Sequence, residues 1–221
     1  MASVLVSSPP IHTLADLLAH LGDIAPDRVR FQPLPGTATE QDVLRIQAHE
    51  GRLCELVEQV LVEKAMGFRE SYLAMALVAA LQQFIMPRNL GLVTGEAGLM
   101  RLAAGLVRIP DIAFISWSRL PEHRVPSEPI PDLVPDLVVE VLSESNTPGE
   151  MQRKRREYFE AGVRLVWMID LKTRTVDVYT DMDSLTTCRE ADTLGGGLVL
   201  PGFTLELRDL FARLDLEADG L

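Results

Sequence analysis

The feature that most constrains the fold is a nearly continuous apolar run, DLVVEVLS at residues 136–143. Such a run is typical of a strand that is covered on both faces, because neither row of side chains meets water. The next segment, TPGE at 147–150, has a capping threonine, proline at the first helical position and glutamate at the third. A second apolar strand, VRLVWMID at 163–170, follows the helix that this cap predicts. The strand, helix and strand predict a right-handed parallel crossover at the centre of an α/β sheet.

The flanking segments predict further strands and one long helix. Two apolar alternations at 53–64 predict a β-hairpin, although its turn lacks the favoured Asn-Gly or Asp-Gly pair. The segment 69–85 carries apolar residues at the spacing of one helical face, and Pro87 ends it. Residues 90–117 are rich in strand formers divided by glycines, and 175–180 predicts one more strand.

The chain length of 221 residues favours one core with an extension. We predict an N-terminal accessory arm at 1–50, a main domain at 51–215 and an acidic tail at 216–221. Within the arm, Leu14, Leu17, Leu18 and Leu21 form a short amphipathic pattern, and Thr39 with Asp42 predicts a helix cap. The glycine run and the short amphipathic segment near the end of the domain, 195–214, are predicted to be peripheral.

Several classes of protein are disfavoured. The most apolar stretch is far shorter than the roughly 20 residues of a membrane span, and the N-terminus lacks a signal-peptide pattern, so we expect a cytoplasmic protein. Cys54 and Cys188 are far apart, and the four histidines are scattered without ligand spacing. Phosphate-loop, nucleophile-elbow and dinucleotide motifs are absent. An aromatic content of 5% offers little platform for a sugar substrate.

Glu140 is the most informative charged residue, because it lies between two valines in the buried strand. Burying an unpaired carboxylate costs several kcal/mol, so a cation, a hydrogen-bond network or a proton must compensate it. The structural alternative is a salt bridge with an arginine such as Arg164. Asp136 lies on the same strand face, but its position after a proline equally suits a cap of the strand end.

Three further residues are candidates for the same site. Asp111 follows a proline and enters another apolar strand, and Lys154 lies on the helix after the Glu140 strand. Glu70 is either a solvent-facing acid in the first turn of its helix or an additional ligand. Carboxylates with a lysine suit a hard divalent cation, Mg²⁺ or Mn²⁺, better than zinc. A solvated basic face is expected for the arginines beside the lysine, namely Arg153, Arg155 and Arg156.

The order of these motifs, PDIAFIS, PDLVVEVLSESNT, KRREYFEAGVRLVWMID and TVDVYT, resembles the Uma-type restriction endonuclease family of the PD-(D/E)XK nuclease superfamily. The resemblance extends to PGTATE, CELVEQVLVEKAMGFRES and LPGFTLELRDLF. It implies a restriction-endonuclease-like mixed β-sheet flanked by helices. It also implies that Asp111 and Glu140 bind the metal together with the main-chain carbonyl of Val141.

The lysine of the superfamily usually stands two residues after the glutamate, where this chain has Leu142. In the Uma-type family the lysine is found on the following helix, four residues before a tyrosine, which corresponds to Lys154 and Tyr158. Many relatives place a histidine where this chain has Glu70, and some nuclease branches use a helical glutamate there as a metal ligand.

The sequence therefore predicts a Mg²⁺- or Mn²⁺-dependent endonuclease that hydrolyses DNA phosphodiester bonds, with homodimerisation expected by analogy alone. The alternative is a non-catalytic module of the same fold that binds nucleic acid or protein. The net charge of −11 favours this alternative and restricts DNA contact to weak or local binding. An open cleft lined by Arg153, Lys154 and Arg156 would favour the nuclease, and a filled pocket the module.

Overall fold

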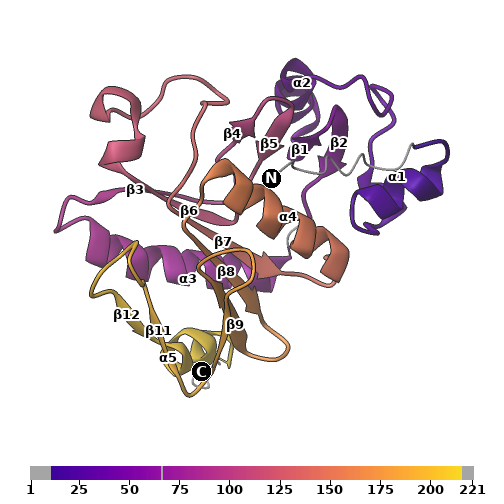
Figure 1. Cartoon of the computed structure of the whole chain (residues 1–221). Coiled ribbons are helices and arrows are strands. Elements are labelled where there is room, and N and C mark those ends of the chain that lie inside the picture. Colours follow the sequence, from indigo (N-terminus) through magenta and orange to yellow (C-terminus); the bar gives the residue numbers. More distant parts are fainter. Residues whose placement is uncertain (1–10, 66, 216–221) are drawn as a thin grey trace, which may run out of the picture.

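A six-stranded mixed sheet forms the centre of the computed structural model, which describes residues 11–65 and 67–215 (Figure 1). Its order is β10-β9-β8-β7-β6-β3. Only β7 and β8 of this sheet pair in parallel, and helix α4 joins them, so the predicted crossover is confirmed. The elements are β3 (Gly91–Thr94), β6 (Ile112–Ser116), β7 (Leu137–Leu142), α4 (Pro148–Ala161), β8 (Leu165–Asp170), β9 (Thr175–Tyr179) and β10 (Leu185–Arg189).

Strand β7 is covered on both faces, as its apolar run predicts. Leu137, Val139 and Val141 pack into one core cluster with helix α3 (Phe68–Ile85), whereas Val138 packs with α4 on the other face. Because side chains alternate along a strand, Glu140 faces the α4 side. Helix α4 begins at the threonine cap and ends before Gly162, as predicted.

A second, four-stranded antiparallel sheet has the order β2-β1-β5-β4. The predicted hairpin is confirmed, and its turn residues Glu58 and Gln59 both have positive φ, 49° and 63°. Within the strand-rich residues 90–117, the chain passes from the small sheet to the large sheet at Pro110. Asp111 therefore lies where the chain passes from one sheet to the other. The strands are β1 (Cys54–Val57), β2 (Val60–Glu63), β4 (Met100–Ala103) and β5 (Leu106–Arg108).

The described part of the arm packs against the small sheet. Leu17, Leu21 and Val29 form a cluster with valines of β1 and β2. The predicted capping box of Thr39 and Asp42 is present at the start of α2. The helices of the arm are α1 (Leu14–His20), η1 (Pro26–Arg28) and α2 (Glu40–Glu50). The predicted acidic tail, 216–221, lies outside the described residues.

The C-terminal segment is not peripheral, which corrects the expectation from sequence. Leu207, Leu210 and Phe211 are buried in the same cluster as β7 and α3, because the apolar side of the short α5 helix closes that face.

No helix in residues 11–65 and 67–215 is long and apolar enough to cross a membrane. The remaining elements are η2 (Trp117–Arg119), η3 (Pro121–His123), β11 (Thr193–Gly195), β12 (Thr204–Glu206), α5 (Leu207–Phe211) and η4 (Ala212–Asp215).

Candidate functional site

Asp111 and Glu140 are brought together by the pairing of β6 and β7. Asp111 directly precedes β6, whose first residue, Ile112, pairs with Val139. The main-chain N–H of Val141 donates to Oδ2 of Asp111 at 2.6 Å. Both acids are 4% exposed. The two predicted acids thus form one buried pair at the junction of the sheets.

Glu140 is held by two side chains of α4. The ammonium of Lys154 lies 3.1 and 3.2 Å from its two oxygens, and the Tyr158 hydroxyl donates to Oε1. Burial raises the pKa of Glu140; Lys154 opposes this shift, and the nearby charges of Asp111 and Glu55 add to it. Two buried carboxylates whose charges oppose each other's ionisation are a setting in which a bound cation is favoured.

The alternative partner, Arg164, is contradicted by the structure. The guanidinium of Arg164 lies 3.4 Å from the carboxylate of Asp136, and the main-chain N–H of Arg164 donates to the main-chain carbonyl of Asp136. Arg164 therefore lies at the beginning of β7, whereas Glu140 is four residues further along that strand. Asp136 also accepts the Ser116 N–H at 2.9 Å, in agreement with a role at the strand end.

Lys154 is enclosed rather than solvated. Its ammonium lies between Glu140 and Glu55, 3.3 Å from the latter. Burial alone would lower the pKa of Lys154, but the charges of Glu140 and Glu55 raise it above its ordinary value. Lys154 is therefore a fixed positive charge beneath the acid pair.

A buried group of charges on the small sheet completes this network, and sequence reasoning missed it. Arg108 of β5 lies 2.6 Å from Glu55 of β1 and also contacts Glu157 of α4. Glu55 accepts the Ile109 N–H at 3.1 Å as well. Burial opposes ionisation of Glu55, but Lys154 and Arg108 lower its pKa to about 2. The sequence signal that could have indicated this group is a charged residue within each of two short apolar strands, Glu55 in β1 and Arg108 in β5.

A second missed residue is Lys64, which follows β2. Its ammonium lies 2.7 Å from Oδ1 of Asp111 and donates to the Ile109 carbonyl at 2.6 Å. Each acid of the pair is thus matched with one lysine. No spacing in the sequence relates Lys64 to Asp111, because the contact depends on how the two sheets meet.

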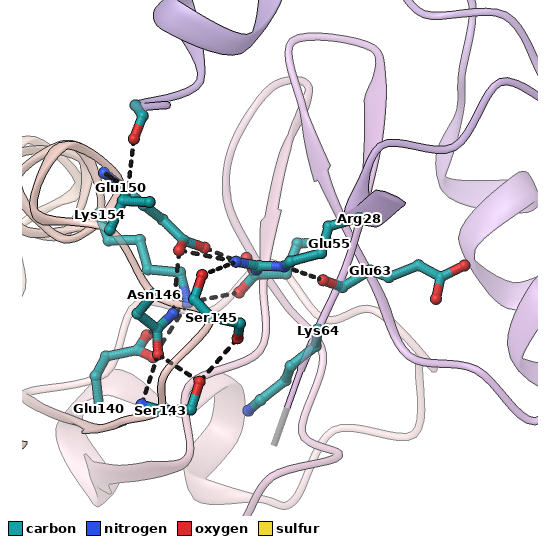
Figure 2. A network of polar contacts seen from close by, with 12 residues as sticks. Arg28, Glu55, Glu63, Lys64, Glu140, Ser143, Ser145, Asn146, Glu150 and Lys154 are labelled. Atoms are coloured by element: carbon teal, nitrogen blue, oxygen red, sulfur yellow. Dashed lines mark hydrogen bonds and ion pairs between the residues drawn. The ribbon is translucent and has the colours of Figure 1, made fainter. Parts of the chain in front are cut away.

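The arm also reaches the site. Arg28 forms a double hydrogen bond with Glu150 at the start of α4, at 2.7 and 2.9 Å. Glu150 in turn accepts from Asn146, which accepts from Ser143 just beyond β7 (Figure 2). This chain of contacts ties the arm to the end of the strand that carries Glu140.

The arginines beside Lys154 do not form the predicted solvated face as a group. Arg153 is buried, lies 2.7 Å from Glu157 and donates to the His20 carbonyl, whereas Arg155 is half-buried and Arg156 is exposed. An open cleft lined by Arg153, Lys154 and Arg156 is therefore not formed over Glu140. The reason is that the arm and the small sheet cover this part of α4.

Glu70 lies apart from the acid pair. Its carboxylate folds back over Gly67 at the start of α3, and it borders a recess shared with Leu142 and Ser143. Among the residues that the structure describes, no three acidic, histidine or cysteine side chains are grouped to hold a metal ion. A ligand role for Glu70 stays a prediction.

The donor set nevertheless suits magnesium. Mg²⁺ is commonly bound through one or two carboxylates and keeps several waters, so Asp111 and Glu140 suffice as protein ligands. Burial and the charge of Asp111 raise the pKa of Glu140, and a divalent ion held by these two acids would supply the compensating positive charge. The carbonyl of Val141 as a further ligand stays a prediction.

The mixed sheet flanked by helices and the acid pair at two adjoining strands define a restriction-endonuclease-like α/β fold. The profile of the Uma2 family, described as "Putative restriction endonuclease", matches residues 40–208, and the chain belongs to this family. The fold is similar to a crystal structure described as a putative nuclease belonging to DUF820 from Anabaena variabilis ATCC 29413, with a TM-score of 0.66. Identity to that protein is 21%, over 83% of this chain and 96% of that chain. No curated protein matches the chain.

Proposed function

We propose that this protein is a metal-dependent nuclease that hydrolyses DNA phosphodiester bonds at the Asp111 and Glu140 pair. The observation that carries the proposal is the pair itself: Asp111 accepts the N–H of Val141, the residue after Glu140, and each of the two buried acids contacts a lysine. Membership of the restriction endonuclease family supports the same chemistry.

Asp111 and Glu140 would hold Mg²⁺ or Mn²⁺, with the Val141 carbonyl and Glu70 as predicted additions. The ion would supply charge neutralisation at the phosphoryl group and an activated water. Lys154 orients Glu140 and opposes the rise in its pKa that burial causes, and the lysine charge would stabilise negative charge that develops nearby. Tyr158 holds the other side of the same carboxylate.

The predicted partners follow from charge and from family analogy. A net charge of −11 restricts DNA binding to local contacts or to contacts that a divalent cation assists. A homodimer and a cytoplasmic location remain part of the proposal.

Three observations favour a second function, a non-catalytic module that binds nucleic acid or protein: the net charge of −11, the lack of an open cleft lined by Arg153, Lys154 and Arg156 over Glu140 in the described residues, and the burial of Glu140. Glu140 is 4% exposed, and Lys154 and Tyr158 cover the carboxylate from the α4 side. In that case the lysines replace the metal as permanent counter-charges of the acid pair.

Plasmid cleavage with Mg²⁺ or Mn²⁺, run beside calorimetry of metal binding, separates the two functions. We expect metal-dependent cleavage by the wild type, with loss of cleavage and of metal binding in Glu140→Gln. Glu160→Gln, an exposed acid on the outer side of α4, is the matched control and should behave as wild type. A wild type that neither binds metal nor cuts DNA would leave the binding module as the function.

A further inference from the structure

The two lysines of the site approach the acid pair from different sides. Lys154 belongs to α4 and contacts Glu140, whereas Lys64 follows β2 and contacts Asp111. Figure 2 shows the Lys64 side chain extending separately from the contacts that join Lys154, Glu140 and Glu55. The two ammonium groups therefore face different surroundings.

The Lys64 side of the pair borders two surface recesses, and the Lys64 side chain itself is 6% exposed. Lys64 lines a surface recess of about 490 Å³ together with Phe68 and Ser71 of α3. Asp111 lines a recess of about 290 Å³ that shares Ser71 and Glu96 with the first, so the two recesses adjoin. Lys64 and Asp111 thus line neighbouring recesses of the described surface.

The Lys64 ammonium also keeps donor capacity. An ammonium has three N–H donors, and within the described residues two acceptors contact it, Asp111 and the Ile109 carbonyl. Lysine is a compact charge on a flexible stem, which suits contact with a phosphate oxygen. Of the acids around the recess, Glu63 is already paired with Arg30 and Arg52, and Glu96 is exposed at the rim.

We propose that Lys64 is the cation that contacts the phosphate of the nucleic acid in this site, an inference that rests on the proposed function. With no substrate, Lys64 neutralises Asp111. When a nucleic acid occupies the recess, the ammonium donates hydrogen bonds to a phosphate oxygen, and no proton or covalent bond is exchanged. Lys154 is then a positioning residue that acts through Glu140.

A purely structural Lys64 predicts a different result. If the lysine only neutralises Asp111, its removal strengthens metal binding and leaves cleavage and DNA binding intact. If it contacts phosphate, its removal strengthens metal binding yet weakens DNA binding and cleavage. Mn²⁺ calorimetry on Lys64→Met therefore checks that the acid pair is intact, and the DNA measurements decide the role.

The experiment compares wild type, Lys64→Met, Lys64→Arg and Lys172→Met, an exposed lysine that pairs with Glu144 on the surface. Cleavage rates are measured with Mg²⁺, and binding of a fluorescent DNA oligonucleotide is measured with Ca²⁺, with urea unfolding to verify each fold. We expect Lys64→Met to lower kcat about 100-fold or more, as for the loss of one charge-stabilising donor. Lys64→Arg should recover part of the loss, and Lys172→Met should match the wild type.

Each outcome decides a different proposal. Cleavage and binding at wild-type levels by folded Lys64→Met would overturn the role of Lys64 and leave the nuclease standing. A wild type that binds the oligonucleotide without cutting it, and loses binding in Lys64→Met, would overturn the nuclease and retain the phosphate contact. A wild type that neither binds nor cuts DNA would overturn both.

Discussion

The crossover unit of β7, α4 and β8 and the small sheet of β1, β2, β4 and β5 contribute to the site in different ways. The crossover unit carries Glu140 and Lys154 on elements that are adjacent in sequence. The small sheet and its flanking residues carry Glu55, Arg108 and Lys64, which meet the crossover unit only in the folded chain. The crossover unit therefore carries one acid of the candidate site with its lysine, and the small sheet and its flanking residues carry further charges that pair with them.

The charges at the contact between the two units also affect the free energy of unfolding. A buried ion pair gains little net stability, because desolvation offsets the attraction, but removal of one partner leaves an uncompensated charge. The contact between the two units contains such charges beside a hydrophobic cluster that joins Met100 and Leu102 of β4 to Met151 of α4. Substitutions that leave charges unpaired across the junction should therefore have much larger effects than substitutions within one unit.

The largest effect is expected for Arg108→Met, which removes the ion pairs of Arg108 between the small sheet and the crossover unit. Arg108 is buried between Glu55 of the small sheet and Glu157 of α4, so its loss leaves two buried acids without their shared cation. We expect the free energy of unfolding to fall by about 3–5 kcal/mol, as for loss of one partner of a buried pair. Urea unfolding measures this, with Arg156→Met on exposed α4 surface as the control. Equal stability of the two variants would show that the junction does not depend on these charges.

A second, smaller effect on stability is expected for Glu55→Gln, and this effect depends on pH. The pKa of Glu55 is lowered from 4.5 to about 2 in the folded protein, so its charge stabilises the fold above pH 4.5. That stabilisation is lost as the pH falls from 4.5 towards 2, because the unfolded chain takes up the proton first. Glu55→Gln should therefore be less stable than wild type by about 3 kcal/mol at pH 7.

Urea unfolding at several pH values tests this prediction. The difference between wild type and Glu55→Gln should shrink as the pH falls through 4.5 towards 2, since a protonated Glu55 resembles glutamine. A difference that stays constant with pH would show that Glu55 contributes by its shape and hydrogen bonds and not by its charge.

The same division explains what the sequence could predict. The β7–α4–β8 crossover, the hairpin, the α3 helix and the caps at Thr39 and Thr147 depend on local patterns, and the structure confirms them. The pair of Asp111 and Glu140 was predicted through the family resemblance, and the structure places the two acids together. Lys64 and Arg108 were missed because no local pattern encodes a contact between two sheets.

The burial of Arg153 and of the C-terminal α5 helix was missed for a related reason. Periodicity shows which face of a helix is apolar, but it does not show which distant segment will cover that face. Arg153 is buried because His20 and Glu58, more than ninety residues earlier, pack over it. A charged residue in a short apolar strand is such a signal for Glu55 and Arg108, whereas Arg153, His20 and Glu58 lie outside the strands.

The smallest effect is expected for Arg164→Met, within the crossover unit. Arg164 was the sequence-based alternative partner of Glu140, but its guanidinium lies 3.4 Å from Asp136 and its side chain is 52% exposed. Asp136 keeps the Ser116 N–H and Arg119 as partners. We therefore expect a change in the free energy of unfolding within about 0.5 kcal/mol, as for exposed ion pairs, and wild-type metal binding. An altered metal affinity measured by calorimetry would mean that Arg164 acts on Glu140 beside Lys154, and a loss of several kcal/mol would mean that its pair with Asp136 is not an ordinary exposed ion pair.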